Sequence, residues 1–249
     1  MTMVRRTMVR TLSVVLVLAA AGAGPVAAAA RTGGAPAAAP VLPPTEDVSP
    51  ALTGEPQRAV GKGVEILGFR SAHFGMTESA VRQAIRTDFG SAANDVVSAR
   101  DEVEKTTSLQ IAVNDLLSVA GKGKVTYVFG VQSKQLKMVN VAWGAAAGVE
   151  TSPAALIDAA AVLRDHFMAK RFRREDLLLD WQLPDGSMVV LRGMDRHRHV
   201  VLLVLAGEKQ ATPTDAPGMV PTLRITTLML SYIQDIQHFD DFHVKPEAF

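Results

Sequence analysis

The sequence has no cysteine, few aromatic residues and no marked excess of either charge. Without cysteine the chain cannot form a disulfide, a thiolate metal site, a cysteine nucleophile or a lipid-modified cysteine. It also contains no G-x-S-x-G elbow, no glycine-rich phosphate loop and no H-E-x-x-H motif. We therefore predict no catalytic residue and no cofactor from motifs.

The first thirty residues have the pattern of a secretory signal peptide. Arg5, Arg6 and Arg10 precede the short apolar run 12–24, and small residues end at Ala30. The arginine pair also fits a twin-arginine export signal. We expect residues 1–30 to be removed, without stable membrane insertion, and the protein to be periplasmic or secreted in a bacterium.

Removal of residues 1–30 would leave 23 basic and 25 acidic residues, a net charge of −2. Nucleic acids and anionic membranes require a basic surface, so neither is an expected partner. Residues 31–57 are rich in Pro and Ala and have little to bury, which predicts a disordered linker. The folded part should follow it.

A helix followed by strands is predicted twice. The first helix follows Gly75, with Thr77 as N-cap and Gly90 at its end. Its apolar side should comprise Ala80, Val81, Ala84, Ile85 and Phe89. Alternating apolar residues then predict three strands within 107–113, 124–130 and 136–143.

The second helix should begin with Ser152 as N-cap and Pro153 in its first turn, and reach the basic run 170–174. Four strands are expected after it, and 200–206 is apolar throughout, so it should be buried on both faces. We predict an α+β fold, an antiparallel β-sheet covered on one face by helices. The predicted units are α-βββ over 58–148 and α-ββββ over 149–249, packed as one globular domain.

The segment FGMTESAVRQAI resembles the helix start of the small outer-membrane assembly lipoproteins of the BamE or SmpA family and of the β-lactamase inhibitor proteins. Gly75, Met76, Thr77 and Val81 carry this resemblance. It implies helices packed on an antiparallel sheet, twice in the inhibitors. The chain lacks the cysteines of both families, so neither lipid tethering nor lactamase inhibition is implied. The segments 104–117 and 125–144 and the tail also resemble small exported proteobacterial proteins, a likeness that implies no activity.

The polar turn of residues 195–199 is the first candidate site. His197 and His199, at i and i+2, would lie on the same side of a strand and could bind zinc. The third ligand would be Asp195 or a member of the C-terminal set His238, Asp240, Asp241 and His243. The alternative reading is an ordinary solvated hairpin turn.

The long connection 207–222 and the segment after residue 236 are the other candidates. The connection exceeds ordinary hairpin length, and with the turn it would form a rim that contacts a partner, Met219 being an apolar anchor. Phe239, Phe242 and Val244 favour packing of the last segment onto the sheet rather than acid–base catalysis.

We therefore predict a non-enzymatic exported interaction module that binds a protein or cell-envelope component through Asp195, Arg196, His197 and Met219. The alternative is a metal-dependent hydrolase that uses His197 and His199 with the C-terminal acids. Metal content of protein purified without a tag would separate the two.

Overall fold

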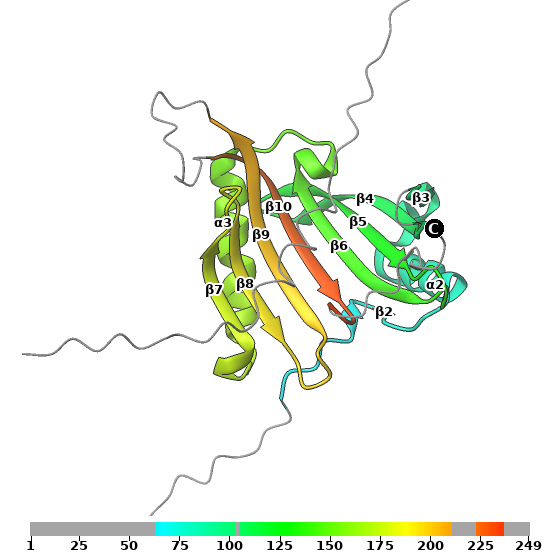
Figure 1. Ribbon diagram of the computed structural model, residues 1–249. Coiled ribbons are helices and arrows are strands. Elements are labelled where there is room, and N and C mark those ends of the chain that lie inside the picture. The colour runs from blue at the N-terminus through cyan, green and yellow to red at the C-terminus, as the bar shows by residue number, and fades with distance from the viewer. Residues whose placement is uncertain (1–62, 103–104, 211–222, 237–249) are drawn as a thin grey trace, which may run out of the picture.

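The computed structural model describes residues 63–102, 105–210 and 223–236. Within these ranges the protein is an α+β fold, in which an eight-stranded antiparallel sheet carries two helices on one face (Figure 1). The expected signal peptide, linker 31–57, Met219 and the residues after 236 lie outside them. No helix in the described ranges is long and apolar enough to cross a membrane.

The segment before the first helix is a short hairpin and a turn. Strands β1 (Gly68–Phe69) and β2 (Ala72–His73) pair with each other, and β1 lies against β6 and β10 of the large sheet. In the turn that follows, Gly75 has a φ of 83°, a conformation that glycine tolerates best. Leu136 N donates to Met76 O at 2.8 Å, so the Gly-Met-Thr turn fastens the helix start to the sheet.

Helix α2 (Glu78–Phe89) begins and ends as predicted. The Thr77 side chain accepts from Ala80 N, and the Gly90 N–H donates to Arg86 O. The side chains of Val81, Ala84 and Ile85 are buried. Ala80 is exposed, contrary to the predicted stripe, because at 100° per residue it lies too far round the helix from Ile85.

Helix α3 (Pro153–Met168) is capped by Ser152, whose side chain accepts from Ala155 N at 3.2 Å. Leu156, Ala160 and Phe167 are buried, which confirms the predicted stripe. The helix ends before the basic run 170–174, which it was expected to reach. In that run Arg173 pairs instead with Asp176 at 2.6 Å.

The large sheet has the strand order β3-β4-β5-β6-β10-β9-β8-β7, and every neighbouring pair is antiparallel. The strand bounds are β3 Val97–Arg100, β4 Thr107–Leu117, β5 Gly121–Phe129, β6 Leu136–Gly144, β7 Leu177–Gln182, β8 Met188–Met194, β9 Val200–Lys209 and β10 Leu223–Ile233. Strand β3, a short edge strand, was not predicted. Short 3₁₀ turns cover Gly90–Asp95, Ala145–Ala147 and Arg174–Asp176.

The element order is a helix followed by four strands, twice, but the two sets share one sheet through the β6–β10 pair. At this junction Gly144 has a φ of 74°, and a Cβ there would lie 2.2 Å from Thr226 O. Glycine therefore permits the close approach of the two central strands. The division into two units stays a prediction.

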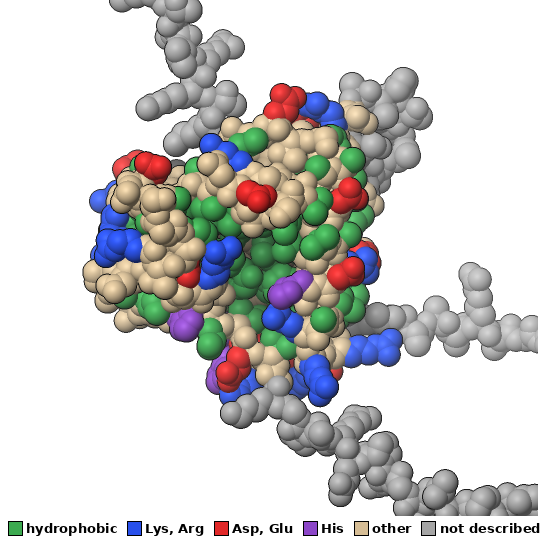
Figure 2. Space-filling model, turned by 180° about the vertical axis from the view of Figure 1, so that it is seen from behind, with side chains coloured by type: hydrophobic (Ala, Val, Ile, Leu, Met, Phe, Trp, Pro, Cys, Tyr) green, Lys and Arg blue, Asp and Glu red, His purple; other side chains and the backbone are tan. Residues whose placement is uncertain are grey.

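Both faces of the sheet bury apolar side chains. The helix face packs α2 and α3 against alternate strand residues such as Tyr127, Val141 and Leu203. Seen from behind, hydrophobic side chains line a hollow in the centre of that face (Figure 2). Val200 to Leu205 of β9 are all buried, as the unbroken apolar run predicted.

Candidate functional site

The predicted polar turn joins β8 to β9 and has a defined hairpin geometry. Arg198 N donates to Asp195 O at 3.0 Å, and Asp195 N donates to His199 O at 2.9 Å. Arg198 has a φ of 68°. This is the three-residue hairpin loop in which a type I turn is followed by a left-handed residue, and Asp is favoured at the first position of such a turn.

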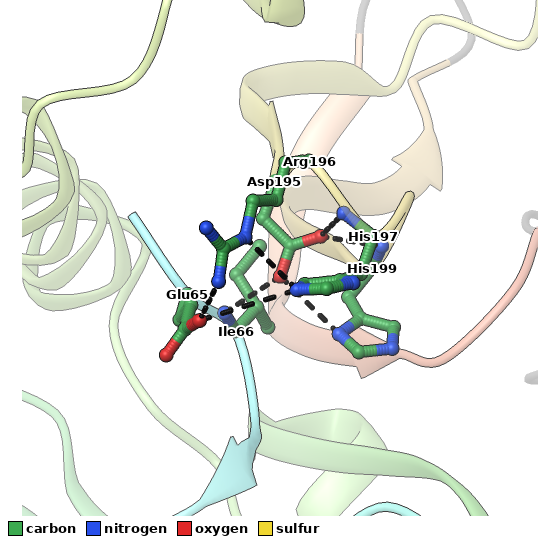
Figure 3. A network of polar contacts seen from close by, with 6 residues as sticks. All are labelled: Glu65, Ile66, Asp195, Arg196, His197 and His199. Carbon is green, nitrogen blue, oxygen red and sulfur yellow. Dashed lines mark hydrogen bonds and ion pairs between the residues drawn. The ribbon is translucent and has the colours of Figure 1, made fainter. Parts of the chain in front are cut away.

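Asp195 lies at the centre of a polar network (Figure 3). One carboxylate oxygen, Oδ1, accepts from His197 N at 2.8 Å and from His199 N at 3.0 Å. The other, Oδ2, accepts from Ile66 N at 2.9 Å. Asp195 is only 4% exposed. A buried carboxylate must be compensated by hydrogen bonds, and three backbone N–H groups do so here.

The Ile66 contact ties together parts of the chain that are far apart in sequence. Ile66 precedes β1 and belongs to the core of the helix face, whereas Asp195 follows β8. The carboxylate thus holds the start of the described chain against the β8–β9 hairpin. Nothing in the sequence around Ile66 indicated this partnership.

The neighbours of Asp195 differ in their exposure. Arg196 is 63% exposed and His197 is 52% exposed on their side chains, and the Arg196 guanidinium pairs with Glu65 Oε1 at 2.5 Å. Arg196 Nε also donates to His197 Nε2 at 3.0 Å. These three side chains form the solvent-facing layer of the network, which we call the turn surface (Glu65, Arg196 and His197).

His199 lies beneath the turn surface and is mostly buried. Its ring packs against Phe74, with centroids 5.1 Å apart. Its Nδ1 lies 3.2 Å from Asp195 Oδ2 but is not aligned for a hydrogen bond. The His199 ring therefore has a packing role and lies close to the Asp195 carboxylate without donating a hydrogen bond to it.

The metal-site alternative receives no third ligand from the described chain. The His197 and His199 rings are near one another, with centroids 5.8 Å apart. Across residues 63–102, 105–210 and 223–236, no three His, Asp or Glu side chains are grouped as metal ligands. The candidates His238, Asp240, Asp241 and His243 lie outside these ranges, so the alternative stays a prediction.

The two parts of the predicted rim, the turn and the long connection, start at opposite ends of β9, and Met219 lies outside the described residues. β9 extends to Lys209, so the connection itself begins at Gln210, and Glu208 on β9 pairs with Arg224 on β10. Val200 and Lys209 stand at opposite ends of β9, roughly 30 Å apart at about 3.3 Å per residue. Consecutive antiparallel turns alternate between the two ends of a sheet, so the connection starts far from the turn.

A second depression, of about 660 Å³, lies at that far end beside the start of α3. Its lining includes Ser152, Glu208 and Arg224. Ser152 is engaged in capping the helix, and Arg224 and Glu208 pair with each other at 2.9 Å. These polar groups serve the fold, and we assign no function to the depression.

Comparison of the chain with protein-family models, curated proteins and solved structures finds no match. The resemblance to the outer-membrane assembly lipoproteins and the lactamase inhibitors therefore stays a prediction.

Proposed function

We propose that this protein is a non-enzymatic exported interaction module and that it contacts a protein of the cell envelope through the turn surface of Glu65, Arg196 and His197. The observation that supports this is that the buried and the exposed side chains of the turn have different roles. Asp195 is buried and is used by three backbone N–H groups, whereas Arg196 and His197 stand exposed on the backbone that it fixes.

A fixed backbone favours binding because less conformational entropy is lost when a partner docks. Arginine is also among the residues that contribute most to protein interfaces, through planar hydrogen bonding and stacking. The turn surface carries both a cation and an anion, Arg196 and Glu65, so a partner with a mixed polar surface fits it better than a polyanion. Met219, which we also predicted to contact the partner, lies outside the described residues.

The test is a charge reversal with a matched control. Arg196→Glu reverses the exposed cation of the turn surface, and Arg82→Glu reverses an arginine that pairs with Glu78 at 2.8 Å on α2. Each substitution breaks one Arg–Glu pair, and only the first alters the proposed surface. We expect cross-linked pull-down from the native envelope to recover at least about tenfold less partner with Arg196→Glu, which corresponds to about 1.4 kcal/mol.

Recovery with Arg82→Glu should equal that of the unsubstituted protein. Far-UV circular dichroism of both variants controls for folding. Equal recovery with both variants would remove the turn surface as the contact site.

A further inference from the structure

The face of the sheet opposite the helices carries its own apolar cluster. We call it the open-face cluster, and its buried members are Val128, Met138, Leu183, Val189, Val200, Leu202, Val204 and Ile233. Successive strand residues point to opposite faces, so Leu202 and Val204 point away from Val201 and Leu203, which pack on the helix side.

These side chains are as buried as those beneath the helices. Leu202, Val204 and Met138 are at most 2% exposed. Both helices of the described chain belong to the other face. A sheet face left to solvent normally carries polar side chains, so this cluster has the composition of a covered surface.

The described chain ends on this cluster. After β10, Gln234 N donates to Lys137 O at 2.9 Å, which holds the chain beside β6. Ile236 then packs against the open-face cluster. The backbone has therefore already turned onto this face where residues 237–249 begin.

The other undescribed segments are attached in less suitable places. The connection that follows Gln210 leaves the sheet at the Lys209 end of β9, whereas Val200 and Ile233 mark the opposite end. Val64 and Ile66, which follow the N-terminal segment, pack into the core of the helix face. Of these three segments, it is the one after Ile236 whose described neighbour packs on the open-face cluster.

The composition and reach of residues 237–249 suit this face. The segment contains Phe239, Phe242 and Val244, which are separated by one or two polar residues. Thirteen residues can extend roughly 40 Å. Neighbouring strands are about 4.8 Å apart, so the segment can pass over β10, β9 and β8 with length to spare.

The charges of Arg192 and of residues 237–249 give an independent reason to place this segment on the open face. Arg192 faces the open side, because it pairs in register with Leu202, and its buried Nε has no hydrogen-bond partner among the described residues. A buried guanidinium N–H group without a partner is costly. Residues 237–249 contain three acidic residues and one lysine, and Asp240 and Asp241 fall between the two phenylalanines.

We propose that residues 237–249 dock across the open-face cluster of the same chain. Phe239, Phe242 and Val244 cover the apolar side chains, and one of the adjacent carboxylates, Asp240 or Asp241, pairs with Arg192. Docking continues the path that Ile236 begins. It also accounts for the burial of an apolar sheet face that would favour association if it were left uncovered.

The absence of cysteine from the chain permits a direct test by thiol labelling. Ser231 lies on β10 on the open face, opposite Leu202, and is 1% exposed. Ser231→Cys is nearly isosteric and reports cover over the cluster. Gln83→Cys places a thiol on an exposed position of α2 and is the control.

Each single-cysteine variant is labelled with a maleimide, with and without the pair Phe239→Ser and Phe242→Ser in the full chain. We expect the serine pair to accelerate labelling at Ser231→Cys at least about tenfold, because the cover then opens more often. Labelling at Gln83→Cys should not change, and circular dichroism should show an intact fold.

A rate at Ser231→Cys that is the same in both backgrounds would overturn the proposal. So would labelling that accelerates when the unsubstituted background is diluted, because a second copy would then be the cover. Asp240→Asn with Asp241→Asn should also accelerate labelling, by a factor of a few, because Arg192 loses its charged partner. No change with that pair would remove Arg192 from the docking site.

Discussion

At the scale of single residues, the side chains that suggested chemistry serve mainly to hold the fold. Asp195, the one acidic residue of the turn 195–199, accepts hydrogen bonds from backbone N–H groups with both carboxylate oxygens. His199 packs on Phe74. We therefore propose Arg196 and His197 as the residues that contact a partner because they are exposed, and not because of their residue type.

The role of Asp195 predicts a stability loss for Asp195→Asn. The amide keeps the shape, but one oxygen becomes an NH₂ group that cannot accept, so a buried backbone N–H loses its partner. We expect a loss of about 1–3 kcal/mol in the free energy of unfolding, measured by urea titration.

Asp185→Asn is the matched control, because the exposed Asp185 also accepts from the backbone two residues on, Ser187 N at 3.0 Å, but its bonds from Ser187 use one oxygen, Oδ1, which the amide retains. Its expected loss is below about 0.5 kcal/mol. Equal losses at both positions would contradict the conclusion that Asp195 holds the turn and the segment around Ile66 together.

The two tyrosines of the chain predict a loss of stability at alkaline pH. Burial raises the pKa of Tyr232 to about 12 and raises the pKa of Tyr127 as well. In the unfolded chain both phenols ionise near pH 10. Their contribution is therefore complete below about pH 10 and is lost as the pH rises toward the folded-state values, since only the unfolded chain then releases protons.

Replacing both residues by Phe removes this dependence. Between pH 9 and 11 the free energy of unfolding of the unsubstituted protein should fall by about 2 kcal/mol more than that of the Tyr127→Phe, Tyr232→Phe variant. Urea titrations at each pH measure the difference. Parallel curves would show that burial does not perturb the two phenols.

At the scale of elements, local signals predicted most of the structure. Thr77 and Ser152 cap their helices, and the unbroken apolar run of β9 is buried on both faces. Strand β3 escaped prediction because it is a short edge strand whose Val97 is exposed, so it has no buried side to mark it. The end of α3 was misplaced because a basic run can follow a helix as well as finish it.

The candidate site was predictable only in part. Its turn was visible in the polar residues between two apolar strands, and Asp is favoured at the first position of such a turn. The contact of Asp195 with Ile66 spans 129 positions, and no local pattern encodes a contact of that range. For the same reason no local pattern showed that the turn and the long connection start at opposite ends of the sheet, and the joint rim stays a prediction because Met219 lies outside the described residues.

At the scale of the whole molecule, both proposals require the two helix-and-strand sets to fold as one body. The Asp195 hairpin in the second set is braced by Ile66, which precedes the first. The open-face cluster likewise contains β5 and β6 residues together with β8, β9 and β10 residues. The β6–β10 pair, with Ser231 bonded to Asn140 at 2.7 Å, joins the two sets.

The chain has two tryptophans, one in each set, and they allow this claim to be measured. Trp143 on β6 is 2% exposed, and Trp181 on β7 is 51% exposed. Trp181→Phe leaves Trp143 as the reporter, and Trp143→Phe leaves Trp181. Unfolding of each variant in urea is followed by tryptophan fluorescence and by far-UV circular dichroism on the same sample.

We predict one transition with coincident midpoints of the two signals in each variant, as two-state unfolding of a single domain requires. A tryptophan signal that changes at a lower urea concentration than the circular dichroism, in either variant, would contradict the shared core. The two sets would then unfold separately.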